Sequence, residues 1–121
     1  IRVGIATTDT FDAWFGELPW AEKTEVIAKV ELLKLLGPRL GRPHADTLSG
    51  SKYPNLKELR ADTKSQTLRI AFAFDPERVG ILLLAGNKQG VGQKHFYKQL
   101  IAKAEVLLEL HLATLKKPKG K

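Results

Sequence analysis

The chain has 121 residues, of which 43% are hydrophobic and 27% are charged, a balance typical of one globular domain. The absence of cysteine excludes disulfides, thiolate metal sites and cysteine nucleophiles, and no apolar run approaches the ~18 residues of a membrane span. We therefore expect one domain over residues 1–115 and a basic tail over residues 116–121, in a cytoplasmic protein without a signal peptide or membrane contact.

The net charge of +7 is confined to the second half of the sequence. Residues 1–56 contain seven Lys and Arg and seven Asp and Glu, so this half is neutral. Residues 57–121 contain thirteen Lys and Arg but only six Asp and Glu. A positive field segregated in this way attracts polyanions, and nucleic acid is the most common such partner. Solubility is the alternative explanation, because four of the lysines lie in the tail.

The N-terminal third predicts a short strand and two helices. The β-branched stretch at residues 2–6 is typical of a strand, and Asp9 is the expected N-cap of a helix that Gly16 interrupts. A second helix is expected from Pro19 to Gly37. The residues expected to face the core are Val26, Ile27, Val30, Leu33 and Leu36, with Trp14, Phe15 and Trp20 covering it.

The middle of the sequence predicts a long loop and then three strands. Gly, Pro, Ser and Asp over residues 37–55 disfavour regular structure beyond a brief strand. Strands are expected at residues 56–62, 67–74 and 79–86, joined as a β-meander. In the second strand, alternation directs Arg69 away from the core face formed by Leu68, Ile70, Phe72 and Phe74.

A last helix is expected from Gln93 to about Leu112, with an apolar stripe of Phe96, Leu100, Ala104, Leu107 and Leu108. Glu105 and Glu109, one turn apart, are interpreted as a solvated face. The order β-α-α-β-β-β-α predicts an α+β fold, with N-terminal helices and a C-terminal helix on a mostly antiparallel sheet.

The stretch GNKQGVGQKHFYK, residues 86–98, is the most distinctive polar segment. Its glycine spacing and its lack of a Ser or Thr hydroxyl exclude a P-loop, and it does not match a dinucleotide-binding fingerprint. What remains is a strand-to-helix hinge bearing Lys88, Lys94, His95, Tyr97 and Lys98. A solvated, non-catalytic turn is the alternative.

The hinge and the meander together carry groups suited to RNA cleavage. Attack by a 2′-hydroxyl requires a proton acceptor, cations that stabilise the phosphorane, and a proton donor for the 5′-oxygen. Arg60 and Arg69 lie on neighbouring predicted strands and can project onto one exposed sheet face near the hinge. Histidine spacing does not suggest a metal site, and no cofactor is expected.

Residues 53–105 resemble the RelE/HigB toxin superfamily of type II toxin–antitoxin systems, nearest its phage-derived HigB-like branch. The resemblance rests on LKELR, LRIAFAF, an apolar strand ending in GNK, and HFYKQLIAKAE, in that order. FDAWFGELP is also similar, whereas GVGQKHFYK departs from the lysine-rich run that is more common at that position.

The resemblance implies a RelE-like fold and a metal-independent, ribosome-dependent mRNA interferase that inhibits translation and growth. It implies as partners mRNA, the 70S ribosome and a helix-turn-helix antitoxin, with DNA contacted only through the antitoxin complex. The implied catalytic residues are Arg60, Arg69, Lys88, His95 and Tyr97, and the implied RNA-binding residues are Lys57, Lys94 and Lys98. The departure leaves open whether His95 or Tyr97 transfers protons.

Two other functions remain compatible with the sequence. One is a gyrase-inhibiting toxin of the same fold without nuclease activity, and the other is a non-catalytic basic RNA-binding module. The apolar stripe of the last helix and the loop over residues 38–55 offer two alternative surfaces for an antitoxin segment.

Overall fold

The computed structural model describes residues 2–116, so most of the expected tail lies outside the described residues. The helices are α1 (Asp9–Gly16), α2 (Trp20–Leu36) and α3 (Gln93–Leu115), with a 3-10 turn, η1, at Gly37–Arg39. The strands are β1 (Ile5–Thr7), β2 (Ala45–Thr47), β3 (Lys57–Asp62), β4 (Thr67–Phe74) and β5 (Gly80–Asn87). The predicted elements are all present, and α3 continues about one turn beyond the expected end.

One sheet of five strands, in the order β1-β5-β4-β3-β2, forms the centre of the fold. The predicted meander is confirmed, because β3, β4 and β5 pair antiparallel in sequence order. β1 adds to β5 in parallel, and β2, within the predicted loop, adds antiparallel to β3. The sheet is therefore mostly antiparallel, as predicted.

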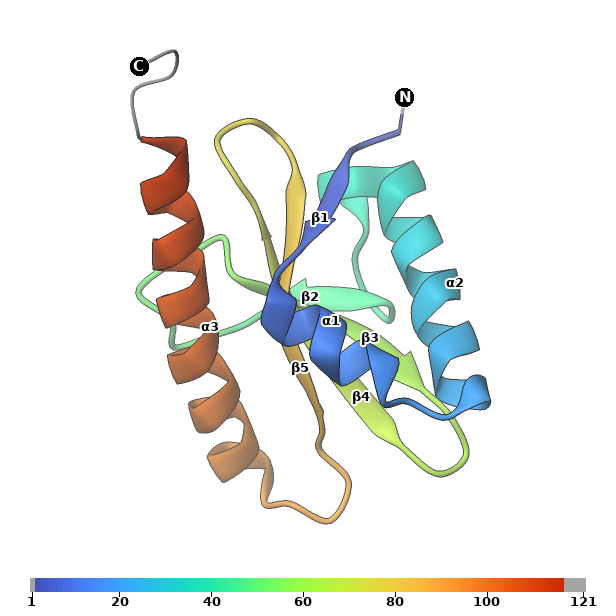
Figure 1. Ribbon diagram of the computed structural model, residues 1–121. Helices are drawn as coiled ribbons and strands as arrows, with labels where there is room; N and C mark the ends of the chain where they lie inside the picture. Colours follow the sequence, from blue (N-terminus) through green and yellow to red (C-terminus); the bar gives the residue numbers. More distant parts are fainter. Residues whose placement is uncertain (1, 117–121) are drawn as a thin grey trace.

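Helices cover both faces of the sheet. Figure 1 shows α1 and α2 on one face and α3 on the other. The first core contains Phe11, Val26 and Leu33 from the helices, with Leu59 and Ile70 from the sheet. The second core is formed by Leu100, Ala104 and Leu108 of α3 against small or apolar residues of β4 and β5. Since β5 contributes to both cores, its continuous apolar run is explained.

The apolar stripe of α3 packs against the sheet. Leu100, Ala104 and Leu108 are all buried against the sheet. The expectation that this stripe meets an antitoxin is therefore wrong, because periodicity identifies an apolar face but not what that face packs against.

Three local predictions in the N-terminal helices are also wrong. Thr8, not Asp9, caps α1, because its Oγ1 accepts a hydrogen bond of 3.0 Å from the backbone N–H of Phe11. Trp20 is 82% exposed and Ile27 is 51% exposed, so neither belongs to the core. The fully buried residues of α2 are Glu22, Val26 and Leu33, a narrower face than the apolar pattern of its sequence predicts.

Within the described residues, no helix is long and apolar enough to cross a membrane.

A contact between His111 and the buried carboxylate of Asp75 joins the far end of α3 to the β4–β5 turn. His111 Nε2 lies 2.8 Å from Asp75 Oδ2, and Asp75 Oδ1 accepts from the backbone N–H groups of Glu77 and Val79. Burial alone would raise the pKa of Asp75, but the hydrogen bonds from His111 and these N–H groups lower it below its usual value. Asp75 therefore fixes both the turn and the end of α3.

This pair predicts a pH-dependent contribution to stability. A carboxyl whose pKa is depressed by folding stabilises the protein above its unfolded pKa of about 3.9, and that contribution is lost as the pH falls through the lower folded value. We expect the urea midpoint of the wild type to fall more steeply below about pH 4 than that of Asp75→Asn. Parallel curves for the two proteins would contradict this assignment.

Candidate nucleic-acid site between the sheet and helix α3

Strand alternation directs a set of charged side chains toward the α3 side of the sheet. In β3, Leu59 and Ala61 face the α1/α2 core, so Glu58 and Arg60 face the other side. Arg60 is paired directly with Arg69 in the β3–β4 register. The sequence-based expectation that the two arginines share one face is therefore confirmed.

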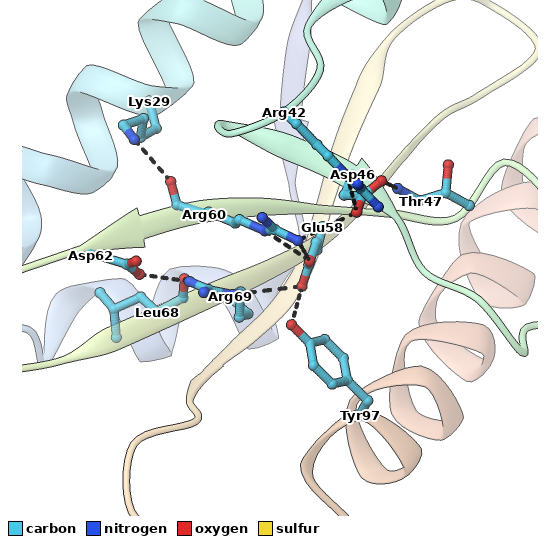
Figure 2. A network of polar contacts seen from close by, with 10 residues as sticks. All are labelled: Lys29, Arg42, Asp46, Thr47, Glu58, Arg60, Asp62, Leu68, Arg69 and Tyr97. Carbon is cyan, nitrogen blue, oxygen red and sulfur yellow. Dashed lines mark hydrogen bonds and ion pairs between the residues drawn. The ribbon is translucent and has the colours of Figure 1, made fainter. Parts of the chain in front are cut away.

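Glu58 is the centre of this network, which Figure 2 shows. Its Oε2 accepts a hydrogen bond from Arg60 Nε at 3.0 Å and lies 2.9 Å from Arg60 Nη2. Its Oε1 accepts from the Tyr97 hydroxyl at 2.7 Å and lies 3.8 Å from Arg69 Nε. One buried carboxylate thus holds a cation from its own strand, a cation from the next strand and the phenol of α3.

Arg69 lies beneath this surface rather than on it. The residue is only 6% exposed, its Nη1 donates to Asp62 Oδ1 at 2.6 Å, and its buried Nε makes no hydrogen bond within the described residues. Burial alone would lower the pKa of Arg69, but the hydrogen bond to Asp62 contributes to a net increase. The expectation that Arg69 projects onto an exposed sheet face is wrong, because α3 packs over that part of the sheet.

Arg60 is more accessible and has a second acidic neighbour. Its Nη2 lies 3.4 Å from Asp46 Oδ2, which also accepts from Arg42 Nε at 2.9 Å. The backbone N–H of Thr47, followed by Arg42, lowers the pKa of Asp46. The side chain of Arg60 is 29% exposed, so it remains partly accessible to solvent.

Tyr97 joins the network from the first turns of α3. Burial, followed by the hydrogen bond to Glu58, raises the pKa of its hydroxyl, which is therefore protonated at neutral pH. The Nζ of Lys88 lies 5.5 Å from the centre of the Tyr97 ring. A proton donor, a carboxylate acceptor and two cations consequently lie together.

These groups line a hollow of about 300 Å³ at the surface. Its walls include Glu58, Arg60, Lys88, Gln93 and Tyr97, and Thr47 to Ser49 close its other side. Arg69 lies behind Glu58 and does not line it. A phosphate in this hollow would meet cationic and proton-transferring groups within one small volume.

Two carboxylates of α3 fix the loop that forms this other side. Glu105 Oε2 accepts from Ser51 Oγ at 2.8 Å and from the backbone N–H of Lys52 at 2.9 Å. Glu109 Oε2 accepts from Tyr53 Oη at 2.7 Å and lies 2.6 Å from Lys52 Nζ. Glu109 is exposed and Glu105 is partly exposed, in accord with the interpretation as a solvated face, but both carboxylates also bind the loop, which that interpretation did not include.

The remaining predicted site residues are not in the hollow. His95 is exposed and lines a different depression of α3 and β5, together with Phe96 and Lys103. Lys94 and Lys98 are exposed along the neighbouring side of α3. Lys57 alternates with Glu58 and so lies toward the α1/α2 face. Tyr97, not His95, therefore lies in the hollow with Arg60 and Lys88.

The sequence reasoning missed Glu58 and Asp62 as members of the site. The sequence could have indicated them, because two arginines predicted on adjacent strands need acidic partners if that face of the sheet becomes buried. Alternation places Glu58 on the face of Arg60, and Asp62 on that face as well.

Among residues 2–116, no three His, Asp or Glu side chains are grouped so that they could hold a metal ion.

Solved structures identify the class of fold. The structure of the toxin RelE of E. coli in the free state aligns with a TM-score of 0.63 at 12% identity, covering 88% of this chain and 97% of RelE. RelE in the archaeal RelE–RelB complex from Pyrococcus horikoshii aligns with a TM-score of 0.55 at 14% identity, covering 75% and 100%. At these identities the likeness establishes the RelE-like α+β fold.

The sequence comparisons establish the family. Residues 13–109 match the phage-derived Gp49-like proteins (DUF891). Two proteins of Mycobacterium tuberculosis are similar: "Putative toxin HigB2", 38% identical over 117 residues, and "Putative toxin HigB3", 41% identical over 103 residues. The matches cover 96% and 85% of this chain, but 58% of HigB2 and 88% of HigB3. The chain belongs to the Gp49-like family, which it shares with these HigB-named relatives, and it has a RelE-like fold.

Proposed function

We propose that this protein is the toxin of a type II toxin–antitoxin system and acts as an mRNA interferase that cleaves translated messages. The observation that carries the proposal is the hydrogen-bonded Tyr97–Glu58 pair beside Arg60 and Lys88 in one surface hollow. The family supports the toxin role, since the relatives HigB2 and HigB3 bear that name.

The geometry supports a cleavage in which the RNA supplies its own nucleophile. The 2′-oxygen attacks the adjacent phosphorus while its proton passes to Tyr97 Oη, which delivers its own proton to Glu58. Arg60 stabilises the charge on the phosphorane oxygens, and Lys88 donates a proton to the departing 5′-oxygen. The bond from phosphorus to the 5′-oxygen breaks, so the products are a 2′,3′-cyclic phosphate and a 5′-hydroxyl. Arg69 positions Glu58 from below.

An antitoxin is the proposed regulatory partner, with the ribosome and its bound message as target. The archaeal structural relative was solved as a RelE–RelB complex, which supports such a partner for a chain of this fold. DNA would be contacted only through the antitoxin. The proposed site of action is the cytoplasm, where translated mRNA is found.

Replacement of Lys88 tests the proposal. We expect Lys88→Ala to reduce cleavage of a translated mRNA, mapped by primer extension, by about 10²-fold because the proton donor to the departing 5′-oxygen is lost. Stability should change little, since the cation–π contact at a partly exposed site contributes about 1 kcal/mol or less. The matched control is Lys64→Ala, which removes the same charge from the exposed β3–β4 turn.

The same experiment distinguishes the alternatives. The same message without a start codon should remain intact if cleavage depends on translation. Equal cleavage by Lys88→Ala and Lys64→Ala would show that the hollow is not the active site. Growth arrest with intact messages and DNA damage would instead indicate a gyrase-directed toxin, and salt-sensitive RNA binding without cleavage a passive binding module.

A further inference from the structure

A second, larger hollow of about 720 Å³ runs along α3 beside the catalytic one. Gln93, Tyr97 and Ser49 line both hollows, so the two adjoin. The second hollow, here called the α3 groove, extends along the helix past Lys94 and Lys98 to Ile101 and Glu105. A polymer that enters the catalytic hollow can therefore continue along α3.

The α3 groove is lined by cations that no acid neutralises. Lys94 and Lys98 are exposed and lie one helical turn apart, so they project on the same side of α3. Neither has a carboxylate within ion-pair distance among residues 2–116, whereas Arg42, Arg60 and Arg69 all do. The acid of the groove, Glu105, is already bound by Ser51 and the backbone of Lys52. Two free ammonium groups in a row suit consecutive phosphates.

The surface between these lysines and the loop suits nucleobases. The partly buried Ile101 and the ring of Tyr97 offer apolar area, while Ser49 and Gln93 offer hydrogen-bonding groups at the rim. Unpaired bases bind to such apolar or aromatic surfaces, with polar groups at their edges. The opposite wall is held to α3 by the Glu105 contacts, so the groove is formed before any ligand arrives.

We propose that the α3 groove binds the single-stranded RNA that flanks the scissile phosphate. Lys94 and Lys98 contact successive phosphates of this flank and position the strand without taking part in the chemistry. The inference rests on the proposed nuclease function for its orientation relative to cleavage, but the binding of RNA in the groove is independent of catalysis.

The test compares Lys94→Gln/Lys98→Gln with Lys103→Gln/Lys116→Gln, which removes one charge elsewhere on α3 and one at its C-terminal cap. Lys103 lines the depression beside His95, away from the groove, and Lys116 is the C-cap residue of α3. The probe is a fluorescent single-stranded RNA of about twelve nucleotides, 2′-O-methylated so that it cannot be cleaved, measured by anisotropy from low to moderate salt.

We expect the groove variant to weaken binding at least about tenfold and to reduce the slope of log K against log salt by about 1.4, since each single-strand phosphate contact contributes about 0.7. In the translation-coupled assay its KM should rise while kcat stays within about twofold, as expected for loss of uniform binding. The control variant should keep the wild-type slope to within about 0.5.

The outcomes separate this inference from the proposed function. Equal slopes and equal KM values in the two variants would overturn the groove while leaving the nuclease intact. If the wild type cleaves nothing but the groove variant alone loses salt-dependent RNA binding, the nuclease fails and the groove stands. If the groove variant binds RNA normally and loses only antitoxin affinity, the groove is a protein-docking surface and the inference is wrong.

Discussion

Tyr97→Phe should reduce translation-dependent mRNA cleavage by about 10²- to 10⁴-fold, the range for removing a group that transfers a proton in the transition state. The variant loses only the hydroxyl that donates to Glu58 at 2.7 Å, while the ring that packs against Phe96 remains. Thermal unfolding should show a change of about 1 kcal/mol, the typical net contribution of one hydrogen bond. Primer extension on a translated message gives the rate.

Tyr53→Phe is the matched control for this change. Tyr53 also donates to a carboxylate at 2.7 Å, that of Glu109, but it is not among the residues that line the catalytic hollow. Its loss should leave the cleavage rate within about threefold of the wild type at a similar cost of about 1 kcal/mol in stability. If both variants cleave at the same rate, Tyr97 is a packing residue and takes no part in proton transfer.

Arg69→Ala should destabilise the fold by about 3 kcal/mol, at the lower end of the range for breaking a buried ion pair. The change leaves Glu58, whose side chain is 4% exposed, without one of its two cations and empties the space beneath it. Arg60 and Tyr97 still bind Glu58, which limits the loss. Chemical denaturation with a constant m-value measures the change.

Arg42→Ala provides the comparison, because it removes the same charge from an ion pair in which Arg42 is 77% exposed. Such pairs contribute about 0–1 kcal/mol, so its denaturation curve should nearly coincide with that of the wild type. Coincidence of the Arg69→Ala curve as well would show that Arg69 is not a structural support of Glu58. If Arg69→Ala is destabilised as expected, a loss of cleavage in this variant could result from unfolding alone. Substitutions of Lys88 and Tyr97 therefore test catalysis more directly.

The distribution of elements followed from the sequence to within a few residues. Period-two alternation in residues 67–74 identified both the strand and the divergence of Arg69 from Leu68 and Ile70. Apolar spacing similarly identified α3, and Gly37 and Pro19 marked the ends of α2. These signals are local, because they depend on the geometry of one element and the conformational preferences of its own residues.

The composition of the site followed only in part. Arg60 and Arg69 were placed on one face correctly, since residues in register on neighbouring strands face the same way. Glu58 was not predicted as a site residue, because an acidic residue that alternates with a core residue such as Leu59 is expected to face solvent unless another element covers that face of the sheet. Packing of α3 is what buries Glu58 and turns it into the partner of Tyr97, 39 residues away.

The sequence by itself determined the elements, their order and the excess of positive charge in the second half of the chain. The tertiary structure alone decided that helices cover both faces, that Arg69 is buried while Arg60 and Lys88 remain accessible, and that Glu105 and Glu109 bind the loop over residues 51–53. The physical reason is that periodicity specifies which side of an element is apolar, whereas the partner of each polar group depends on contacts between segments distant in sequence.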